Sequence, residues 1–419
     1  MSLVAFIVFG IAALAAIPIA HALILGALAA ATYSDRVPLN MVVEQMVSQV
    51  QSFPLIAIPF FILTGSLMMG GTLGKTLVDF LTTLIGRFHG GPAQVGVLSS
   101  AVFGGVSGSA VADASALGSM LIPWQKRLGY PAPFSAATLA AASTIDILIP
   151  PSIPMIIYSL ASSASIGSLF VAGVLPGIIL TVGYMSVCYI IGRRRNYPRE
   201  TRPFSGGILL REIGLASPAL ALPVLIIIFL RFGVATPTEV SVVSTLYAAI
   251  VSAVVYRDLT LKRIRAAVLE AGIASGVVLL VIMASSAVGW IVTYEQLPAG
   301  FAEYAKNTLQ QPWLIIVAMN LIMLFAGMFI DLPAAVLLLT PIFVPLAQIA
   351  GMDTIQLGIM MLVNLSLGLF TPPVGTTLFI TSSIAKVKIG ETVRALLPFY
   401  VVALIVLLMM SYIPALTIY

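Results

Sequence analysis

Charged side chains are scarce in this chain of 419 residues. It holds 20 lysines and arginines and 15 aspartates and glutamates, so 8% of the residues are charged while 60% are hydrophobic. A soluble domain has roughly 25% charged residues, which give it a hydrated surface. The scarcity therefore excludes a soluble enzyme, and most of the surface is expected to face lipid.

Cysteine and histidine are also scarce. Cys188 is the one cysteine and lies in an apolar run, so neither a disulfide within the chain nor a cysteine metal site is expected. His21 and His89 are the two histidines, too few for a typical zinc or haem site. We expect no cofactor and no enzymatic activity.

Long apolar runs are what the sequence has instead. A helix that crosses a bilayer needs about 20 apolar residues. Clear runs of this kind fall at 3–31, 54–72, 169–192, 213–230, 238–256, 271–293 and 395–417. The short alternating segments of a β-barrel are missing, so the fold class is an all-α polytopic membrane protein with about ten spans and two hairpins. The first run lacks a basic start and a cleavage site, so we expect a retained helix rather than a signal peptide.

The net charge of +5 does not indicate nucleic acid, because the basic residues lie in short segments between apolar runs. Such segments tend to face the cytoplasm. The main clusters lie at 193–212, which holds six arginines, at 257–265 and at 386–394. With these and Lys126 in the cytoplasm, the stretch 93–122 must enter and leave on one side. A re-entrant hairpin with arms of about a dozen residues does this, although charge alone also permits two full crossings.

Two apolar stretches contain a similar interruption. A Pro-Pro pair begins at Pro150 within the stretch 134–162, and another begins at Pro372 within the stretch 354–385. Paired prolines remove two amide donors and clash with the preceding turn. Each helix is therefore expected to break near the membrane midplane.

A segment rich in small residues precedes each broken helix and predicts a hairpin. By the charge pattern, the first hairpin opens to the cytoplasm and the second to the outside, so the two halves form an inverted repeat. The expected organisation begins with an N-terminal scaffold helix and connector at 1–53, followed by a first repeat at 54–192 with its hairpin at 93–122 and its broken helix at 134–162. A basic cytoplasmic loop at 193–212 then leads to scaffold helices and an amphipathic surface helix at 213–270. The second repeat covers 271–419, with its hairpin at 313–349 and its broken helix at 354–385.

Inverted repeats with paired discontinuous helices are typical of secondary transporters. Unwound carbonyl groups and helix C-termini supply oxygen ligands to Na⁺, while the N-termini of half-helices attract an anion through free N–H groups. A cation and a carboxylate can therefore share one site. A plainer interpretation is that the prolines only kink helices for packing, since proline is frequent in membrane helices. That interpretation could explain a single interruption, but it does not explain why two matching interruptions each follow a segment rich in small residues.

Three aspartates, Asp113, Asp146 and Asp331, lie in apolar stretches that hold no basic residue. A charged side chain in such surroundings costs about 2.5–3.5 kcal/mol on the insertion scale, so a bound cation or a proton is expected to compensate it. Asp331 is the strongest candidate for a cation site, because it lies at the interruption of the second hairpin. Its alternative role is to cap the second arm. For Asp146, a helix cap or an interhelical hydrogen bond is as well supported as a direct role in binding. For Asp113, a capping role is favoured over a role in binding.

Several motifs in a fixed order carry a resemblance to a known family. They are GRFHGG (86–91), FGGVSGSAVAD (103–113), IPPSI (149–153), LFVAGVLPG (169–177), TPTE (236–239), GMFID (327–331) and FTPPVG (370–375). Over nearly its whole length the chain resembles the large membrane subunit, of the DctM type, of tripartite ATP-independent periplasmic (TRAP) transporters.

The resemblance implies a Na⁺-driven secondary transporter in the inner membrane of a bacterium or archaeon. It would import an organic anion, usually a carboxylate, by elevator movement of a transport domain against a scaffold domain. The implied partners are a periplasmic substrate-binding protein and a small four-helix membrane subunit. The sequence does not identify the carboxylate.

The resemblance also implies which residues bind the ions and the substrate. The first Na⁺ site would use Ser107, Gly108, Ser109, Ile149 and Ser152, and the second would use Gly327, Asp331, Thr371, Val374, Gly375 and Thr376. The substrate would lie between the two hairpin tips, with Ser109, Asp146, Pro151, Pro373 and Thr377 as candidate contacts. One departure from the family pattern is Ile145-Asp146 before the first Pro-Pro pair, where small residues including glycine are usual.

Functions of other kinds fit parts of the sequence. The segment 105–108 matches a G-x-S-G pattern, in which Ser107 would be the nucleophile of an intramembrane serine protease and His21 its base. That hypothesis leaves the second hairpin and the repeated Pro-Pro pair unexplained. A passive channel or a proton-coupled anion carrier of similar shape is the other alternative.

Overall fold

The computed structural model describes residues 1–34, 37–69, 71–200, 205–309 and 311–417. Within these residues all regular secondary structure is helical, which confirms the prediction of an all-α fold. The apolar runs give helices because only intra-segment hydrogen bonds satisfy a backbone that faces lipid.

Six helices of the described residues are long and apolar enough to cross a membrane. They are α10 (Ile166–Arg194), α11 (Gly206–Arg231), α12 continued by the π-helix η3 (Pro237–Val255), α13 (Leu261–Tyr294), α16 (Leu332–Ile349) and α19 (Ile389–Tyr412). A seventh crossing results if α3 (Leu39–Val50) forms one span with the 3₁₀-helix η1 (Phe53–Ile56) and α4 (Ala57–Met69), which it meets at 62°. The expected number of about ten is larger because several apolar stretches are divided into shorter helices.

The prediction of a single span at 3–31 is wrong. The chain forms two helices there, α1 (Ser2–Leu14) and α2 (Ile19–Ser34), which pack against each other. Pro18 has no amide hydrogen and cannot continue a helix, and Ala16 has a left-handed φ of 59° at the turn. The uniformly apolar composition of this run conceals the turn.

The basic loop expected at 193–212 is shorter than predicted. Helix α10 continues to Arg194, and α11 begins at Gly206. Residues 201–204 of the predicted loop, which include Arg202, lie outside the described residues.

The amphipathic surface helix expected before residue 271 is not a separate element. Its residues form the first turns of α13, a single helix of 34 residues. No glycine or proline lies between Leu261 and Ala271 to end the helix, so the amphipathic turns and the apolar span are continuous. The boundary between the predicted scaffold and second repeat therefore falls inside α13.

Two pairs of helices are joined by very short turns. Helix α6 (Gly91–Ser107) turns into α7 (Ala110–Arg127), and α15 (Pro312–Gly327) turns into α16. The arms α6 and α7 have 17 and 18 residues and are longer than predicted, because α7 continues through its polar end. Arm length therefore no longer favours a re-entrant hairpin over two full crossings, and the charge pattern permits both.

Each Pro-Pro pair lies between two helices. Helix α8 (Ala132–Ala142) and the 3₁₀-helix η2 (Ser143–Ile147) precede the first pair, and α9 (Ile153–Ser162) follows it. Helix α17 (Thr354–Gly368) precedes the second pair, and α18 (Thr376–Ala385) follows it. Both Pro–Pro bonds are cis.

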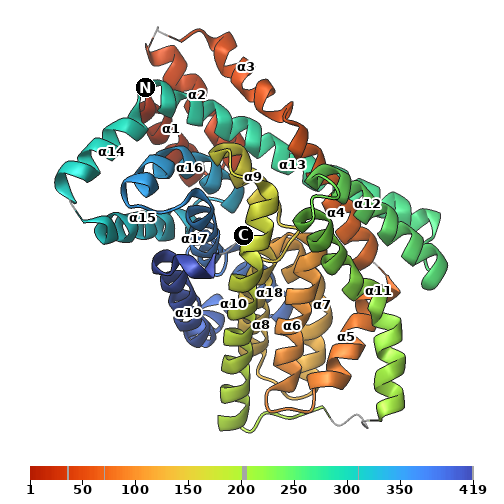
Figure 1. The fold of residues 1–419 in the computed structure, drawn as a ribbon. Helices are drawn as coiled ribbons and strands as arrows, with labels where there is room; N and C mark the ends of the chain where they lie inside the picture. The colour runs from red at the N-terminus through yellow and green to blue at the C-terminus, as the bar shows by residue number, and fades with distance from the viewer. Residues whose placement is uncertain (35–36, 70, 201–204, 310, 418–419) are drawn as a thin grey trace.

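The interrupted helices of the two halves form one packed unit (Figure 1). Helix α18 packs against α7 and α8, while α9 packs against α16 and α17. The Tyr158 hydroxyl donates a hydrogen bond to the carbonyl of Thr354 at 2.6 Å. The Thr377 hydroxyl donates to the carbonyl of Ala140 at 3.2 Å. The two interruptions are thereby held in a fixed relation to each other.

Helix α13 crosses the upper part of Figure 1 as one long rod. It packs against α2, α3, α4 and α16, and its second half shares a separate apolar cluster with the N-terminal helices. The other described helices are α5 (Thr72–Ile85), α14 (Leu297–Thr308) and the 3₁₀-helix η4 (Pro414–Leu416). This arrangement sets α13 opposite the tips of the two helix pairs.

Candidate functional site

The tip between α6 and α7 consists of Gly108 and Ser109. Gly108 has a φ of 59°, a left-handed conformation that favours glycine, and it ends α6. Ser109 precedes α7, and its hydroxyl accepts a hydrogen bond from the amide of Ala112 at 3.4 Å. The hydroxyl of Ser107 turns inward and donates to Asp146 Oδ2 at 3.3 Å.

The first interruption packs directly on this tip. A Cβ on Gly108 would overlap the carbonyl oxygen of Pro151 and would lie 3.3 Å from the amide nitrogen of Ile153. The structure therefore brings together the tip and the interruption that the resemblance assigns to a first Na⁺ site.

The side chains of the first interruption are largely engaged. The Ser152 hydroxyl donates to the carbonyl of Ile147 at 2.6 Å and accepts from the amide of Met155 at 3.4 Å, so it caps α9. The Ile149 side chain lies beside α10, because a Cβ on Gly177 would be 2.8 Å from Ile149 Cγ1. Any contribution of Ile149 to the tip would come from its backbone.

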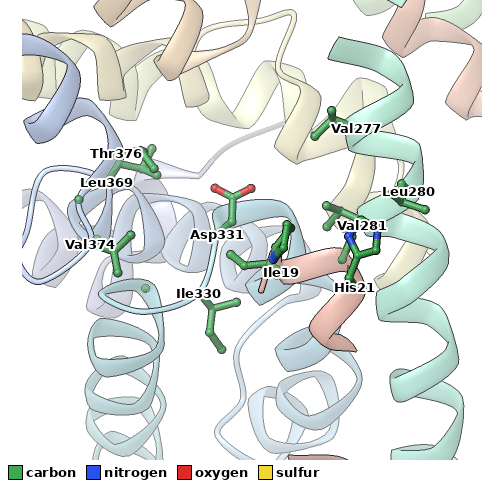
Figure 2. Close-up of a pocket in the computed structure, with 15 residues that line it drawn as sticks. Ile19, His21, Val277, Leu280, Val281, Ile330, Asp331, Leu369, Val374 and Thr376 are labelled. Carbon is green, nitrogen blue, oxygen red and sulfur yellow. The ribbon is translucent and has the colours of Figure 1, made fainter. Parts of the chain in front are cut away.

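The second tip ends at Asp331, which precedes the first turn of α16. Asp331 occupies the N-cap position, but its side chain forms no capping hydrogen bond. Figure 2 shows the carboxylate pointing into a cavity instead. The capping alternative for Asp331 is therefore not what the structure shows.

The second interruption also packs directly on its own tip. The amide of Val374 donates to the carbonyl of Met328 at 3.3 Å. A Cβ on Gly368 would overlap the carbonyl oxygen of Gly327 and would lie 2.8 Å from the Cα of Gly327. These backbone contacts hold the tip against the break.

Three threonines surround the second interruption, and one of them has an open hydroxyl. The Thr371 hydroxyl donates to the carbonyl of Leu367 at 2.5 Å, and the Thr377 hydroxyl donates to the carbonyl of Leu369 at 2.9 Å. The Thr376 hydroxyl oxygen is buried and has no hydrogen-bond partner within the described residues. Thr376 is thus the hydroxyl best placed to accept a ligand beside Gly375.

A cavity of about 300 Å³ lies between the two tips. The N-termini of three helices line it: α7 through Ala110, α9 through Ile153 and α16 through Leu332. Asp331 is the one charged residue among the described residues that line this cavity. The arrangement provides helix N-termini, but no basic side chain, to an anion.

A neighbouring cavity of about 320 Å³ shares Asp331 with the first (Figure 2). Gly327 and Thr376 line it from the second tip and the second interruption. His21 of α2 and Val281 of α13 line its other side. Asp331 therefore separates two cavities and faces both.

One face of α13 forms the opposite wall. Residues Glu270, Ala274, Val277 and Val281 follow each other at intervals of four, three and four, so they lie on one side of the helix. They line these two cavities and a third of about 270 Å³, which Ser107 also lines. The sequence alone did not reveal this wall, because Ala274, Val277 and Val281 are apolar residues of a long helix and resemble any lipid-facing turn.

The five predicted substrate contacts lie in different surroundings. Ser109 lines the cavity between the tips. Asp146 and Thr377 are fully buried, form hydrogen bonds inside the protein and do not line that cavity. Pro151 is buried beneath the first tip, and Pro373 is exposed.

The pairing required for a serine protease is not formed. Ser107 is 4% exposed and donates its hydroxyl hydrogen bond to Asp146. His21 lines the cavity that holds Asp331, whereas Ser107 lines the cavity that holds Glu270. A nucleophile needs its base within hydrogen-bond reach, and the structure gives Ser107 a different partner.

Residues 2–416 match the family model described as "Tripartite ATP-independent periplasmic transporter, DctM component". The chain belongs to the DctM family. As a DctM protein it is a multi-pass membrane subunit of a transporter and not an enzyme. The resemblance drawn from the motifs is confirmed.

Named relatives of this DctM chain cover most of its length. It is 51% identical over 419 residues to y4mL of Sinorhizobium fredii, covering 100% of both chains. It is 39% identical to the C4-dicarboxylate TRAP transporter large permease protein DctM of Pseudomonas aeruginosa, covering 87% of this chain and 85% of that one. It is 35% identical to the sialic acid TRAP transporter large permease protein SiaM of Vibrio cholerae, covering 96% and 94%.

A solved structure shares the fold of this DctM chain at low sequence identity. The YdaH transporter of Alcanivorax borkumensis aligns with a TM-score of 0.62 and 16% identity, over 90% of this chain and 88% of that one. At this identity the likeness concerns the fold alone.

Proposed function

We propose that this DctM protein is the large permease of a Na⁺-driven TRAP transporter that imports an organic acid across the inner membrane of a bacterium or archaeon. A periplasmic binding protein delivers the acid, and a small membrane subunit completes the three-part assembly that the family description names. The relatives named for C4-dicarboxylate and sialic acid support a carboxylate as the substrate class.

The observation that carries the proposal is the meeting of three helix N-termini at one cavity. Helices α7, α9 and α16 all begin at the cavity of about 300 Å³ between the tips. Each N-terminus carries about half a positive charge and free N–H groups, which suit a carboxylate. The volume is in the range of a small-molecule site.

Asp331 explains why a cation is needed for an anion to bind. It is the charged residue that lines the cavity, and its negative charge repels a carboxylate. A Na⁺ held by Asp331 and the open hydroxyl of Thr376 would reverse this local charge. The anion would then bind only with the ion, which is the thermodynamic basis of symport.

The apolar wall on α13 supports an elevator mechanism. Ala274, Val277 and Val278 face the tips with aliphatic side chains, which offer no hydrogen bonds to break when one surface slides on the other. In this proposal the two helix pairs and the interrupted helices form the transport domain of the inverted repeat. Helix α13 and the N-terminal helices form the scaffold.

Reconstitution tests the proposal directly. The chain is placed in proteoliposomes with its small subunit, and uptake of a labelled carboxylate is measured with the binding protein outside. We expect uptake only with an inward Na⁺ gradient and the binding protein present. Equal uptake with K⁺ in place of Na⁺ would contradict Na⁺ coupling, and uptake driven by a pH gradient alone would establish the proton-coupled alternative.

A further inference from the structure

Two aspartates in the first half of the protein are buried against the same helix, α6, and neither lines the cavity between the tips. Asp113 lies in the first turn of α7, and Asp146 lies in η2 before the first interruption. Both are 0% exposed, and the elements that carry them, α7 and η2, pack against each other and against α6. Neither residue is used by the transport site described above.

One face of α6 holds both carboxylates. Ser100, Gly104 and Ser107 follow each other at intervals of four and three residues and therefore share a face. The Ser100 hydroxyl donates to Asp113 Oδ2 at 2.6 Å. The Ser107 hydroxyl donates to Asp146 Oδ2 at 3.3 Å. The two acids thus occupy adjoining positions on one helix surface.

Gly104 lies between the two serines and leaves space for the carboxylate of Asp146. A Cβ on Gly104 would be 2.7 Å from the Cα of Asp146 and 2.9 Å from its Oδ1. The Oδ1 atom of Asp146 therefore lies against α6 at Gly104, on the same face whose Ser100 binds Asp113.

Each carboxylate has one oxygen without a partner. Asp113 Oδ1 and Asp146 Oδ1 are buried, and neither has a hydrogen-bond partner within the described residues. An unsatisfied buried charge is costly, and two like charges in one low-dielectric region raise that cost. No basic side chain of the described residues pairs with either acid.

We propose that Asp113 and Asp146 bind a Na⁺ between them through these two free oxygens, with the hydroxyls of Ser100 and Ser107 holding the carboxylates in position. This cation site lies behind the first tip and shares Ser107 with it. Only the identity of its ion rests on the proposed function. Na⁺ suits oxygen ligands. A transition metal does not fit, because the described residues hold no cluster of three or more His, Cys, Asp and Glu side chains.

A bound ion at this place would act on the first tip. It would link α6, α7 and η2, the three elements that converge behind Gly108. Ser107 belongs to both this site and the tip, so an ion behind the tip would fix the orientation of that hydroxyl. The site would therefore make the geometry of the first tip depend on Na⁺.

Counting bound ions tests the proposal. The full-length protein is purified without Na⁺, and binding of radioactive Na⁺ is measured by equilibrium dialysis at constant ionic strength with choline. We expect Asp146→Asn and Asp113→Asn each to bind one ion fewer per chain than the wild type. Asp353→Asn removes an aspartate at the start of α17 and should leave the count unchanged. An unchanged count in both site variants would overturn the proposal.

A milder variant keeps the proposal testable if the aspartate variants do not fold. Ser100→Ala removes only the hydroxyl that holds Asp113, and we expect it to weaken binding of one Na⁺ by several-fold. Ser100→Thr keeps the hydroxyl and should restore it. Displacement of the ion by micromolar Ca²⁺, but not by Na⁺, would overturn the assignment to Na⁺.

The failure of this site and the failure of Na⁺ coupling give different results. If uptake does not follow the Na⁺ gradient but the aspartate variants still lose one bound ion, Na⁺ coupling is wrong and this site stands. If uptake follows the Na⁺ gradient and the variants keep every bound ion, the coupling stands and this site is wrong.

Discussion

Gly108 packs against the carbonyl oxygen of Pro151, so the first hairpin tip and the first Pro-Pro interruption touch through backbone atoms. Gly108 also has a φ of 59°, which favours glycine. We expect Gly108→Ala to reduce uptake by at least about tenfold, because a left-handed non-glycine residue costs about 1–2 kcal/mol and the new methyl group displaces Pro151. The measurement is initial uptake in proteoliposomes.

Gly214→Ala is the matched control for this variant. A Cβ on Gly214 would meet nothing within 4 Å, and the residue lies within α11. We expect its uptake to match the wild type, since alanine favours a helix more than glycine does. Normal uptake by Gly108→Ala would show that contact between the tip and the interruption is dispensable.

Asp331 gives a prediction about the ion. Asp331→Asn keeps the size of the side chain and removes the charge that faces both cavities. We expect the Na⁺ concentration for half-maximal uptake to rise about tenfold, because a charged oxygen ligand is worth roughly 1.5 kcal/mol more than a neutral one. Asp353→Asn on the same half should not change it. An unchanged Na⁺ dependence in Asp331→Asn would remove Asp331 from the ion site.

The sequence predicts those parts of the site that depend on local chemistry. Proline has no amide hydrogen, so both interruptions could be located from Pro150 and Pro372 alone. Asp331 could be selected because a carboxylate is rare in an apolar stretch. Long helices such as α10 and α19 could be predicted because their residues are almost all apolar over a length that spans a bilayer.

Other parts depend on tertiary packing and could not be predicted. The wall formed by Ala274 and Val277 has no local signal, since it becomes a wall only where the tips face α13. The neighbourhood of Asp113 and Asp146 depends on how η2 packs on α6 at Gly104. The turn at Pro18 had a local signal that the length of the apolar run concealed.

Asp258 and Arg263 give a prediction about stability and pH. They form an ion pair at 2.5 Å next to the start of α13, and Asp258 also accepts a hydrogen bond from the amide of Thr72 at 2.7 Å. Partial burial acts to raise the pKa of Asp258, but the Thr72 amide and the Arg263 guanidinium outweigh it and hold the pKa below the usual 3.8. The pair therefore joins the turn before α5 to the turn before α13.

The sign of the pH effect follows from the lowered pKa. The contribution of Asp258 is fully present above the unfolded pKa of 3.8 and is lost as the pH falls through the lower folded value. We expect Asp258→Asn to lower the stability by about 1 kcal/mol or less at pH 7, since the pair is partly exposed. Thermal unfolding at pH 7 and below pH 3 measures this. A difference between variant and wild type that is as large below pH 3 as at pH 7 would contradict the ionic origin.

The cavity between the tips gives a prediction about space. Ala274 lies on the wall of α13 and lines this cavity of about 300 Å³. Ala274→Phe would fill part of it, so we expect uptake to be abolished while Na⁺ binding by the purified protein persists. Ile273→Phe places the same ring one residue earlier, at a side chain that is 62% exposed, and should transport normally. Equal uptake by Ala274→Phe and Ile273→Phe would mean that the substrate does not pass between the tips and α13, and the three helix N-termini would then need another ligand.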